Sequence, residues 1–207
     1  MGNIVSWLSG ELAVRGAEEA IRRFYDRKKA DASEELSEAL RNANISMDEA
    51  VASDETIAML HRWDRAWKEG AAREKLRLLA QLLAGELGPE ARGSDEFLNL
   101  ADIVVSLSHE EIVFLAVLAK YEAFAATQSK EAYQAHKIVR RLTTEALVGK
   151  GKAFANTDEF IAAGVALGRT GFVQPVDGGT GKSFAKTARL DRLVRLTRLE
   201  EWAERAV

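Results

Sequence analysis

Cysteine is absent from all 207 residues of the chain, and this excludes several kinds of chemistry at once. The protein cannot form disulfides, use a thiolate nucleophile, or hold zinc or an iron–sulfur cluster through sulfur. Long apolar runs are absent too: the longest extends only from Ile112 to Ala119, whereas a helix needs about 20 apolar residues to cross a bilayer. We therefore expect a cytoplasmic protein without a membrane span.

Proline is scarce, with only Pro89 and Pro175 in the chain, and Ala, Leu, Glu and Arg dominate most of the remainder. Such a composition is typical of helical proteins. The exception is residues 172–187, where strand-like segments flank a glycine-rich stretch, as in a β-hairpin. The sequence therefore predicts a mainly α protein, a multi-helix bundle with one small hairpin in a winged-helix-like C-terminal region.

Two serines followed three residues later by glutamate mark helix starts. Ser46 with Glu49, and Ser108 with Glu111, match the capping box. In this motif the serine oxygen accepts the amide of the glutamate, and the carboxylate accepts the amide of the serine. We expect one helix to begin at each serine.

Apolar residues at helical spacing predict the longer elements. A first helix is expected over residues 11–29 and a second over 31–40. The pattern over 53–87, weakened only at Gly70, is expected to form the longest element. The run 112–119 is apolar on nearly every face, so its helix is expected at the centre of the fold.

A boundary is expected at residues 89–93, because Gly-Pro stops one helix and Ser-Asp-Glu suits the start of another. It would separate an acidic N-terminal helical region, 1–88, from a C-terminal region, 94–207, with one compact domain as the alternative. Residues 1–107 carry 14 basic and 20 acidic side chains, whereas residues 108–207 carry 15 and 12. Residues 127–198 carry 13 basic and 6 acidic side chains, so any polyanion contact is expected there.

The stretch Gly-Thr-Gly-Lys-Ser that ends at Ser183 resembles a phosphate-binding loop. That loop requires glycine five positions before Gly181, where this chain has Val176. Strand-like residues follow in place of a long helix, and too little chain remains for the sheet of an NTPase. We expect a hairpin tip and no nucleotide or other cofactor.

A winged helix would place cations on the hairpin and base-reading groups on the preceding helix. The helix over 158–169 has almost no long polar side chains, so base recognition is not expected. The cations predicted to contact a polyanion or a partner are Lys182, Lys186, Arg189, Arg192 and Arg195. The alternative is a solvated basic face of an amphipathic helix.

The three histidines, His61, His109 and His136, fall on separate predicted helices and form no HxxxH or ExxH pair. No metal site is therefore predicted. GxSxG is absent, and no catalytic residues can be chosen from the sequence. An enzyme site assembled from carboxylates and histidines of separate helices stays open as an alternative.

Trp63 and Trp67 lie four residues apart on the apolar side of their helix. Core packing is the first explanation, and a protein interface is the alternative, because large rigid aromatics often anchor partners. A second apolar cluster is expected to dock on the body of the protein or on a second copy. It consists of Ile4, Val5, Trp7, Leu8 and Leu12.

Three segments of the chain follow one another in an order that is also found in other helical proteins. They are Leu82-Leu83 in a leucine-rich helix, Leu107-Ser108 with Glu111 at the next helix start, and Leu167 to Val173 before the hairpin. Their layout resembles uncharacterised bacterial helical proteins and, distantly, the abortive-infection alpha family. The likeness covers about residues 72–190. It implies a phage-defence or regulatory context and carries over no catalytic residue.

Elimination of the enzymatic motifs leaves three hypotheses. The first is a non-enzymatic interaction or regulatory protein that binds a protein partner or forms a homo-oligomer. The second is a protein that binds nucleic acid through phosphate contacts in the basic C-terminal region. The third is an enzyme with a carboxylate and histidine site.

Overall fold

The computed structural model describes the backbone of the chain except at residues 1–3, 51–52, 89–92, 178–181 and 207. Within the described elements, the side chains of residues 4–21, 24, 47, 177, 182, 205 and 206 also lie outside the description. Among the described residues, no helix is long and apolar enough to cross a membrane.

The protein is mainly helical with one two-stranded antiparallel sheet, so the predicted fold class is confirmed. The helices are α1 (Ile4–Asn42), α2 (Met47–Ala50), α3 (Asp54–Lys68), α4 (Arg73–Glu86), α5 (Ser94–Ser106), α6 (His109–Gln128), α7 (Ala132–Leu147), α8 (Thr157–Leu167), α9 (Ala188–Thr197) and α10 (Glu201–Ala206). A short 3-10 turn, η1 (Gly168–Thr170), precedes strands β1 (Val173–Asp177) and β2 (Lys182–Lys186).

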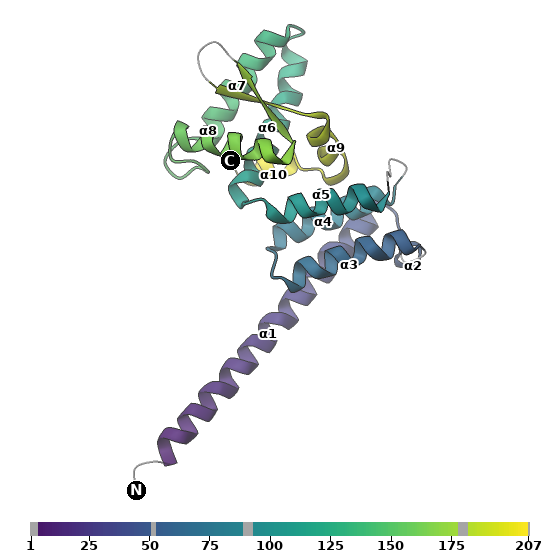
Figure 1. The fold of residues 1–207 in the computed structure, drawn as a ribbon, viewed down its shortest axis with the longest axis vertical. Coiled ribbons are helices and arrows are strands. Elements are labelled where there is room, and N and C mark those ends of the chain that lie inside the picture. Colours follow the sequence, from purple (N-terminus) through teal and green to yellow (C-terminus); the bar gives the residue numbers. More distant parts are fainter. Residues whose placement is uncertain (1–3, 51–52, 89–92, 178–181, 207) are drawn as a thin grey trace.

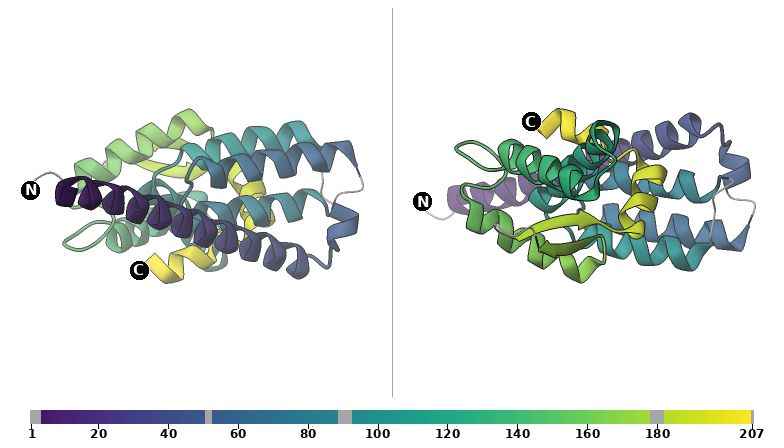
Figure 2. Two further views of the ribbon diagram at one scale, coloured as in Figure 1. Left: turned by 90° about the horizontal axis from the view of Figure 1, so that it is seen from below. Right: turned by 90° about the horizontal axis from the view of Figure 1, so that it is seen from above.

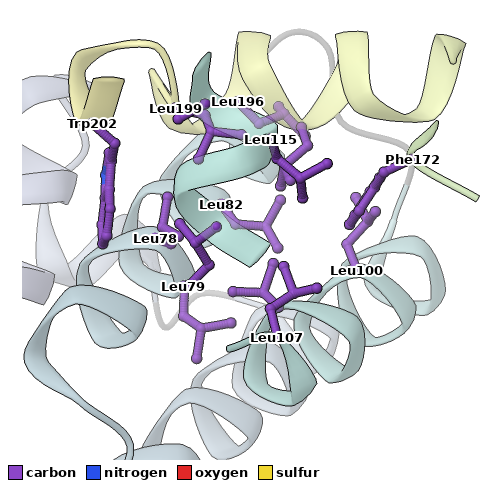
Figure 3. Packing of buried hydrophobic residues seen from close by; sticks show 14 of the residues in the cluster. Leu78, Leu79, Leu82, Leu100, Leu107, Leu115, Phe172, Leu196, Leu199 and Trp202 are labelled. Carbon is purple, nitrogen blue, oxygen red and sulfur yellow. The ribbon is translucent and has the colours of Figure 1, made fainter. Parts of the chain in front are cut away.

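The helices form two groups that share one hydrophobic core. Helices α3, α4 and α5 lie beside the C-terminal end of α1, and the hairpin lies with α6, α7 and α8 in the other group (Figure 1). Figure 2 shows α1 running along the length of the molecule in the view from below. Leucines of α4, α5, α6 and α9 meet between the groups, next to Trp202 of α10 (Figure 3). The boundary expected at residues 89–93 therefore does not divide the core, and the division into two regions stays a prediction.

Helix α6 lies at the centre, as its apolar run predicts. Every residue from 112 to 119 is buried. The helix begins with the expected capping box: the amide of Glu111 donates to Ser108 Oγ at 3.1 Å, and the amide of Ser108 donates to Glu111 Oε2 at 2.9 Å. The capping box at Ser46 is also present, with the Ser46 amide 2.7 Å from Glu49 Oε2. Both predicted helix starts are confirmed.

The first helix differs from its prediction, because α1 continues through the break expected near residue 30. Acidic residues in the segment where the second helix was expected to begin pair with α4 instead. Arg73 contacts Asp31, Glu34 and Glu35, and Glu35 also binds Arg77. These acidic residues thus form ion pairs with another helix and do not begin a new helix.

The element expected over residues 53–87 is two helices. Gly70 has a φ of 85°, a left-handed conformation that glycine adopts without strain, and the chain turns there between α3 and α4. The longest helix is therefore α1. Its N-terminal part extends away from the body (Figure 1), so the backbone of residues 4–12 does not dock there. The side chains of the apolar cluster in this segment lie outside the described residues.

The hairpin packs against the body through its strands. Val176 pairs with Ser183 and Pro175 with Phe184 in antiparallel register. The Phe184 ring is buried and packs against the ring of Phe114 at a centroid distance of 5.7 Å. On α8, Gly164 approaches this ring so closely that an added Cβ would lie 2.3 Å from it. The described strands are thus held against α6 and α8, and the predicted tip at residues 178–181 lies outside the described residues.

Candidate binding pocket between α7 and the hairpin

A pocket of about 280 Å³ lies between α7 and the hairpin. Its apolar lining consists of Ala132, Val176 and Ala185 together with the ring of Tyr133, which is 60% exposed. Its polar lining consists of His136, Lys137, Arg140 and Ser183. Among the described residues that line this pocket, none is acidic.

The helix supplies its share of the lining by simple periodicity. Tyr133, His136, Lys137 and Arg140 are spaced by three, four and seven residues, which places them on one face of α7. The other face, which includes Val139, is buried. Burial of that face orients the pocket face of α7 toward the hairpin.

The hairpin supplies its share by alternation. Successive side chains of a strand point to opposite faces. Phe184 of β2 enters the core beside α8, so Ser183 and Ala185 face α7. Val176 contributes from β1, directly across from Ser183.

His136 and Ser183 form a polar contact across the pocket. Nε2 of His136 lies 3.1 Å from Ser183 Oγ, and Ser183 Oγ donates to the carbonyl oxygen of Val176 at 3.0 Å. A hydroxyl has one proton, so His136 must donate its Nε2 proton to the serine. A general base would need the opposite direction, with the histidine accepting the hydroxyl proton. In this arrangement the pair holds the hairpin to α7, and the serine proton is directed at the carbonyl oxygen of Val176.

The charge of His136 follows from its surroundings. Burial of the ring, together with the nearby Arg140 guanidinium, lowers the pKa of His136 from its ordinary value of 6.5. The imidazole is therefore neutral at pH 7 and can carry its proton on Nε2.

Two cations border the pocket. Lys137 Nζ lies 4.7 Å from the centroid of the Tyr133 ring, a cation–π contact that holds the ammonium beside the aromatic wall. Arg140 lies one turn further along α7. Glu131 precedes the helix and is exposed, but it is not part of the lining. The pocket therefore combines an apolar interior with a positive rim.

A second groove, between α5 and α9, has a different charge balance. It is lined by three carboxylates, Asp95, Glu96 and Asp191, and by the three arginines of α9 at positions 189, 192 and 195. Opposite charges already face one another there. The pocket beside α7 is thus the better candidate for an anionic partner.

Arg192 is not available for the contact predicted from the sequence. Its side chain is buried, with the residue 4% exposed, and Nη2 lies 2.5 Å from Glu86 Oε1. Nε lies 2.8 Å from Glu96 Oε1. A buried guanidinium needs carboxylates of this kind to offset its lost hydration. Arg192 therefore joins α9 to α4 and α5, and the idea of a basic face formed by every arginine of α9 is wrong at this position.

The other predicted cations are dispersed. Arg189 donates to Asn99 and to the carbonyl oxygen of Thr170, and Lys186 Nζ lies 2.7 Å from Asp191 Oδ1. Arg195 is exposed at the α5–α9 groove. Lys182 lies in β2, but its side chain is outside the described residues. Their joint role as a contact surface stays a prediction.

The tryptophan pair belongs to the core side of α3. Trp63 is 7% exposed, and its Nε1 donates to the carbonyl oxygen of Leu76 at 3.4 Å. Trp67 is partly buried, and its Nε1 donates to Asp64 Oδ1 at 3.0 Å. Trp63 therefore packs in the core, which was the first explanation from the sequence. In this conformation it is not exposed as an interface anchor.

The histidines do not converge on a metal site. His109 is exposed and its Nδ1 lies 3.1 Å from Glu74 Oε2, His61 is exposed on α3, and His136 lies at the hairpin. Within the described parts of the chain, no group of three or more histidine or carboxylate side chains is arranged to hold a metal ion.

Two of the segments that suggest the abortive-infection resemblance are in contact. Arg169 Nη1 lies 2.8 Å from Glu111 Oε1, and this ion pair joins η1 to the first turn of α6. Searches against protein-family models, curated proteins and solved structures find no match for the chain. The resemblance therefore stays a prediction.

Proposed function

We propose that this chain is a non-enzymatic interaction protein that binds a partner protein at the pocket between α7 and the hairpin. The observation that carries the proposal is an apolar pocket whose described lining has two cations, Lys137 and Arg140, and no carboxylate. The direction of the His136–Ser183 hydrogen bond adds support, because it favours a structural contact over general-base chemistry.

The biological setting of this binding is inferred from the resemblance given above. It implies a regulatory role in a bacterial cytoplasm, in phage defence or a related process. A binding protein of this kind needs no cofactor, because it catalyses no reaction.

A photo-crosslinking amino acid at Gln134 tests the proposal in the cells that make the protein. Gln134 is exposed on α7 between two lining residues and does not line the pocket itself. We expect a crosslinked partner protein of defined mass, lost in the double variant Lys137→Glu/Arg140→Glu. Lys29→Glu/Lys150→Glu is the matched control, because both lysines are exposed and the change in charge is the same. Equal crosslinking by both double variants would contradict the assignment of the pocket.

Nucleic-acid binding is the second candidate, favoured by exposed cations close to α7. These are Lys130, Lys137, Arg141 and Lys150. Contacts to phosphates release counterions, so the affinity must fall steeply as salt rises. This candidate predicts that a labelled oligonucleotide binds at low salt and dissociates as salt rises from about 50 to 200 mM. Over that range about six phosphate contacts lower affinity by roughly a thousandfold. No binding at low salt would exclude this candidate.

A further inference from the structure

The size of the α7–hairpin pocket limits what can occupy it. Its volume of about 280 Å³ lies just below the range of roughly 300–1,000 Å³ that is usual for small-molecule and cofactor sites. The space is small for a dinucleotide. It can accommodate one large side chain inserted from a partner.

The interior of the pocket favours a hydrocarbon or phenyl group over a nucleobase. The walls are Ala132, Val176, Ala185 and the Tyr133 ring. Nε2 of His136 and Oγ of Ser183 already bind each other, and Ser183 also donates to a backbone carbonyl. The apolar walls offer no hydrogen bond to the edge of a base, which would lose water on entering between them. An apolar side chain has no hydrogen bonds with water to lose.

The rim defines the charge of the residues beside that side chain. Lys137 and Arg140 lie one turn apart on the same face of α7. On the hairpin, Lys186 Nζ lies 2.7 Å from Asp191 Oδ1. Carboxylates brought in by a partner would lie near Lys137 and Arg140, and no described residue of the lining is acidic.

We propose that the pocket takes one large apolar side chain, phenylalanine or leucine, from an acidic segment of the partner protein, whose carboxylates lie against Lys137 and Arg140. This inference rests on the proposed function and names the chemistry of the partner. In this arrangement the Tyr133 ring is the aromatic wall beside the inserted group. The ring is exposed in the free protein and is therefore accessible to a partner.

The test uses the full-length protein with labelled alanine methyl groups and the peptide acetyl-Glu-Glu-Phe-Glu-Glu-amide as the probe. We expect the methyl resonances of Ala132 and Ala185 to shift on titration, because the phenyl ring of the probe would lie beside them. The exposed Ala155 serves as an internal reference and should not move.

Matched peptides separate the contribution of the apolar group from that of charge. Replacing phenylalanine by alanine should weaken binding at least tenfold, and replacing all four glutamates by lysine should abolish it. Equal affinity of the alanine peptide would overturn the proposal, because it would show attraction by charge alone.

Variants of the protein locate the site. Lys137→Glu/Arg140→Glu should weaken binding of the phenylalanine peptide at least tenfold, whereas Lys29→Glu/Lys150→Glu should leave it unchanged. Ala132→Trp is a second kind of variant: it blocks the mouth from an exposed position and keeps every charge, and it should abolish the methyl shift of Ala185.

Two further outcomes would overturn the proposal. One is the absence of any shift of Ala132 or Ala185 at millimolar peptide in the folded protein. The other is a single-stranded oligonucleotide that shifts these methyls when the peptide does not. If the peptide does not bind while the crosslink at Gln134 is still formed, the proposed protein binding is supported and only the proposed chemistry of the partner is wrong. If neither is observed, both proposals are wrong.

Discussion

Helices α9 and α7 both carry cations beside the same hairpin, but they place them in opposite surroundings. On α9, Arg192 is buried between Glu86 and Glu96. On α7, Lys137 and Arg140 border an apolar pocket whose described lining holds no carboxylate. The number of positive charges alone does not distinguish the two helices. The comparison shows that the role of a cation depends on the groups that neighbouring elements bring toward it.

The two faces of β2 differ in the same way. Phe184 fills the space against α6 and α8, where its ring centroid lies 6.1 Å from that of Phe160. Ser183 and Ala185, on the other face, leave an unfilled pocket against α7. One side of the hairpin is therefore closed by packing, and the other remains open to a ligand.

The largest expected effect comes from Arg192→Ala. This change removes the Arg192 guanidinium that lies 2.5 Å from the buried Glu86 carboxylate, and breaking such a pair costs about 3–5 kcal/mol of unfolding free energy. Urea denaturation measures the loss. Lys137→Ala should change stability by no more than about 0.5 kcal/mol, as for an ordinary surface position. Similar losses for the two variants would erase the distinction between α9 and α7.

The double variant Glu86→Met/Arg192→Met refines this test. It removes both charges and keeps apolar volume, so it should recover part of the stability lost by Arg192→Ala. A double variant that is less stable than the single one would show that Glu86 does not depend on Arg192.

The next largest effect is expected from Gly164→Ala. The new Cβ would lie 2.3 Å from the Phe184 ring, and overpacking of this kind costs about 1–3 kcal/mol. Gly168→Ala is the matched control, because no heavy atom lies within 4 Å of its added Cβ. Thermal or urea denaturation distinguishes them.

Ala185→Val adds methyl groups on the open face of the same strand. Valine suits a strand, and the pocket has room for it, so stability should stay within about 0.5 kcal/mol. A loss as large as that of Gly164→Ala would mean that the α7 side is closed as well.

The smallest effect concerns His136. Because its pKa is lowered in the folded protein, the unfolded chain binds more protons near the ordinary pKa of 6.5. The stability that comes from neutral His136 is thus complete above pH 6.5 and is lost as the pH falls through the lower folded pKa. His136→Gln should remove this part of the pH dependence, measured by denaturation at pH 7.5 and 5.5.

Nitrogen chemical shifts of His136 test the direction of its hydrogen bond at the same time. We expect the proton on Nε2 at pH 7.5 and a titration midpoint below 6.5. A proton on Nδ1 would reverse the hydrogen bond with Ser183 and restore the geometry of a general base.

Local signals were enough to predict several elements of the fold. The boxes at Ser46 and Ser108 need only residues three positions apart, and the burial of α6 follows from its own apolar faces. The continuity of α1 was not predictable in this way. Its Asp31 and Glu34 resemble a helix start until Arg73, on another helix, is seen to pair with them.

The candidate site shows the same limit. The spacing of Tyr133, His136, Lys137 and Arg140 on one helical face is visible in the sequence, yet nothing local indicates that Ser183, 47 residues beyond His136, completes the pocket. The burial of arginine at position 192 was likewise hidden, because its carboxylate partners lie on helices formed much earlier in the chain.

The pair between Glu86 and Arg192 spans 106 residues, and this separation has a consequence for synthesis. A ribosome releases the N-terminal segments first, so α4 emerges long before α9. Until α9 has been made, the Arg192 guanidinium cannot accompany the carboxylate of Glu86 into the core, which disfavours final packing of α4. A nascent chain halted before residue 188 will therefore keep the leucine-rich face of α4 accessible to chaperones and proteases.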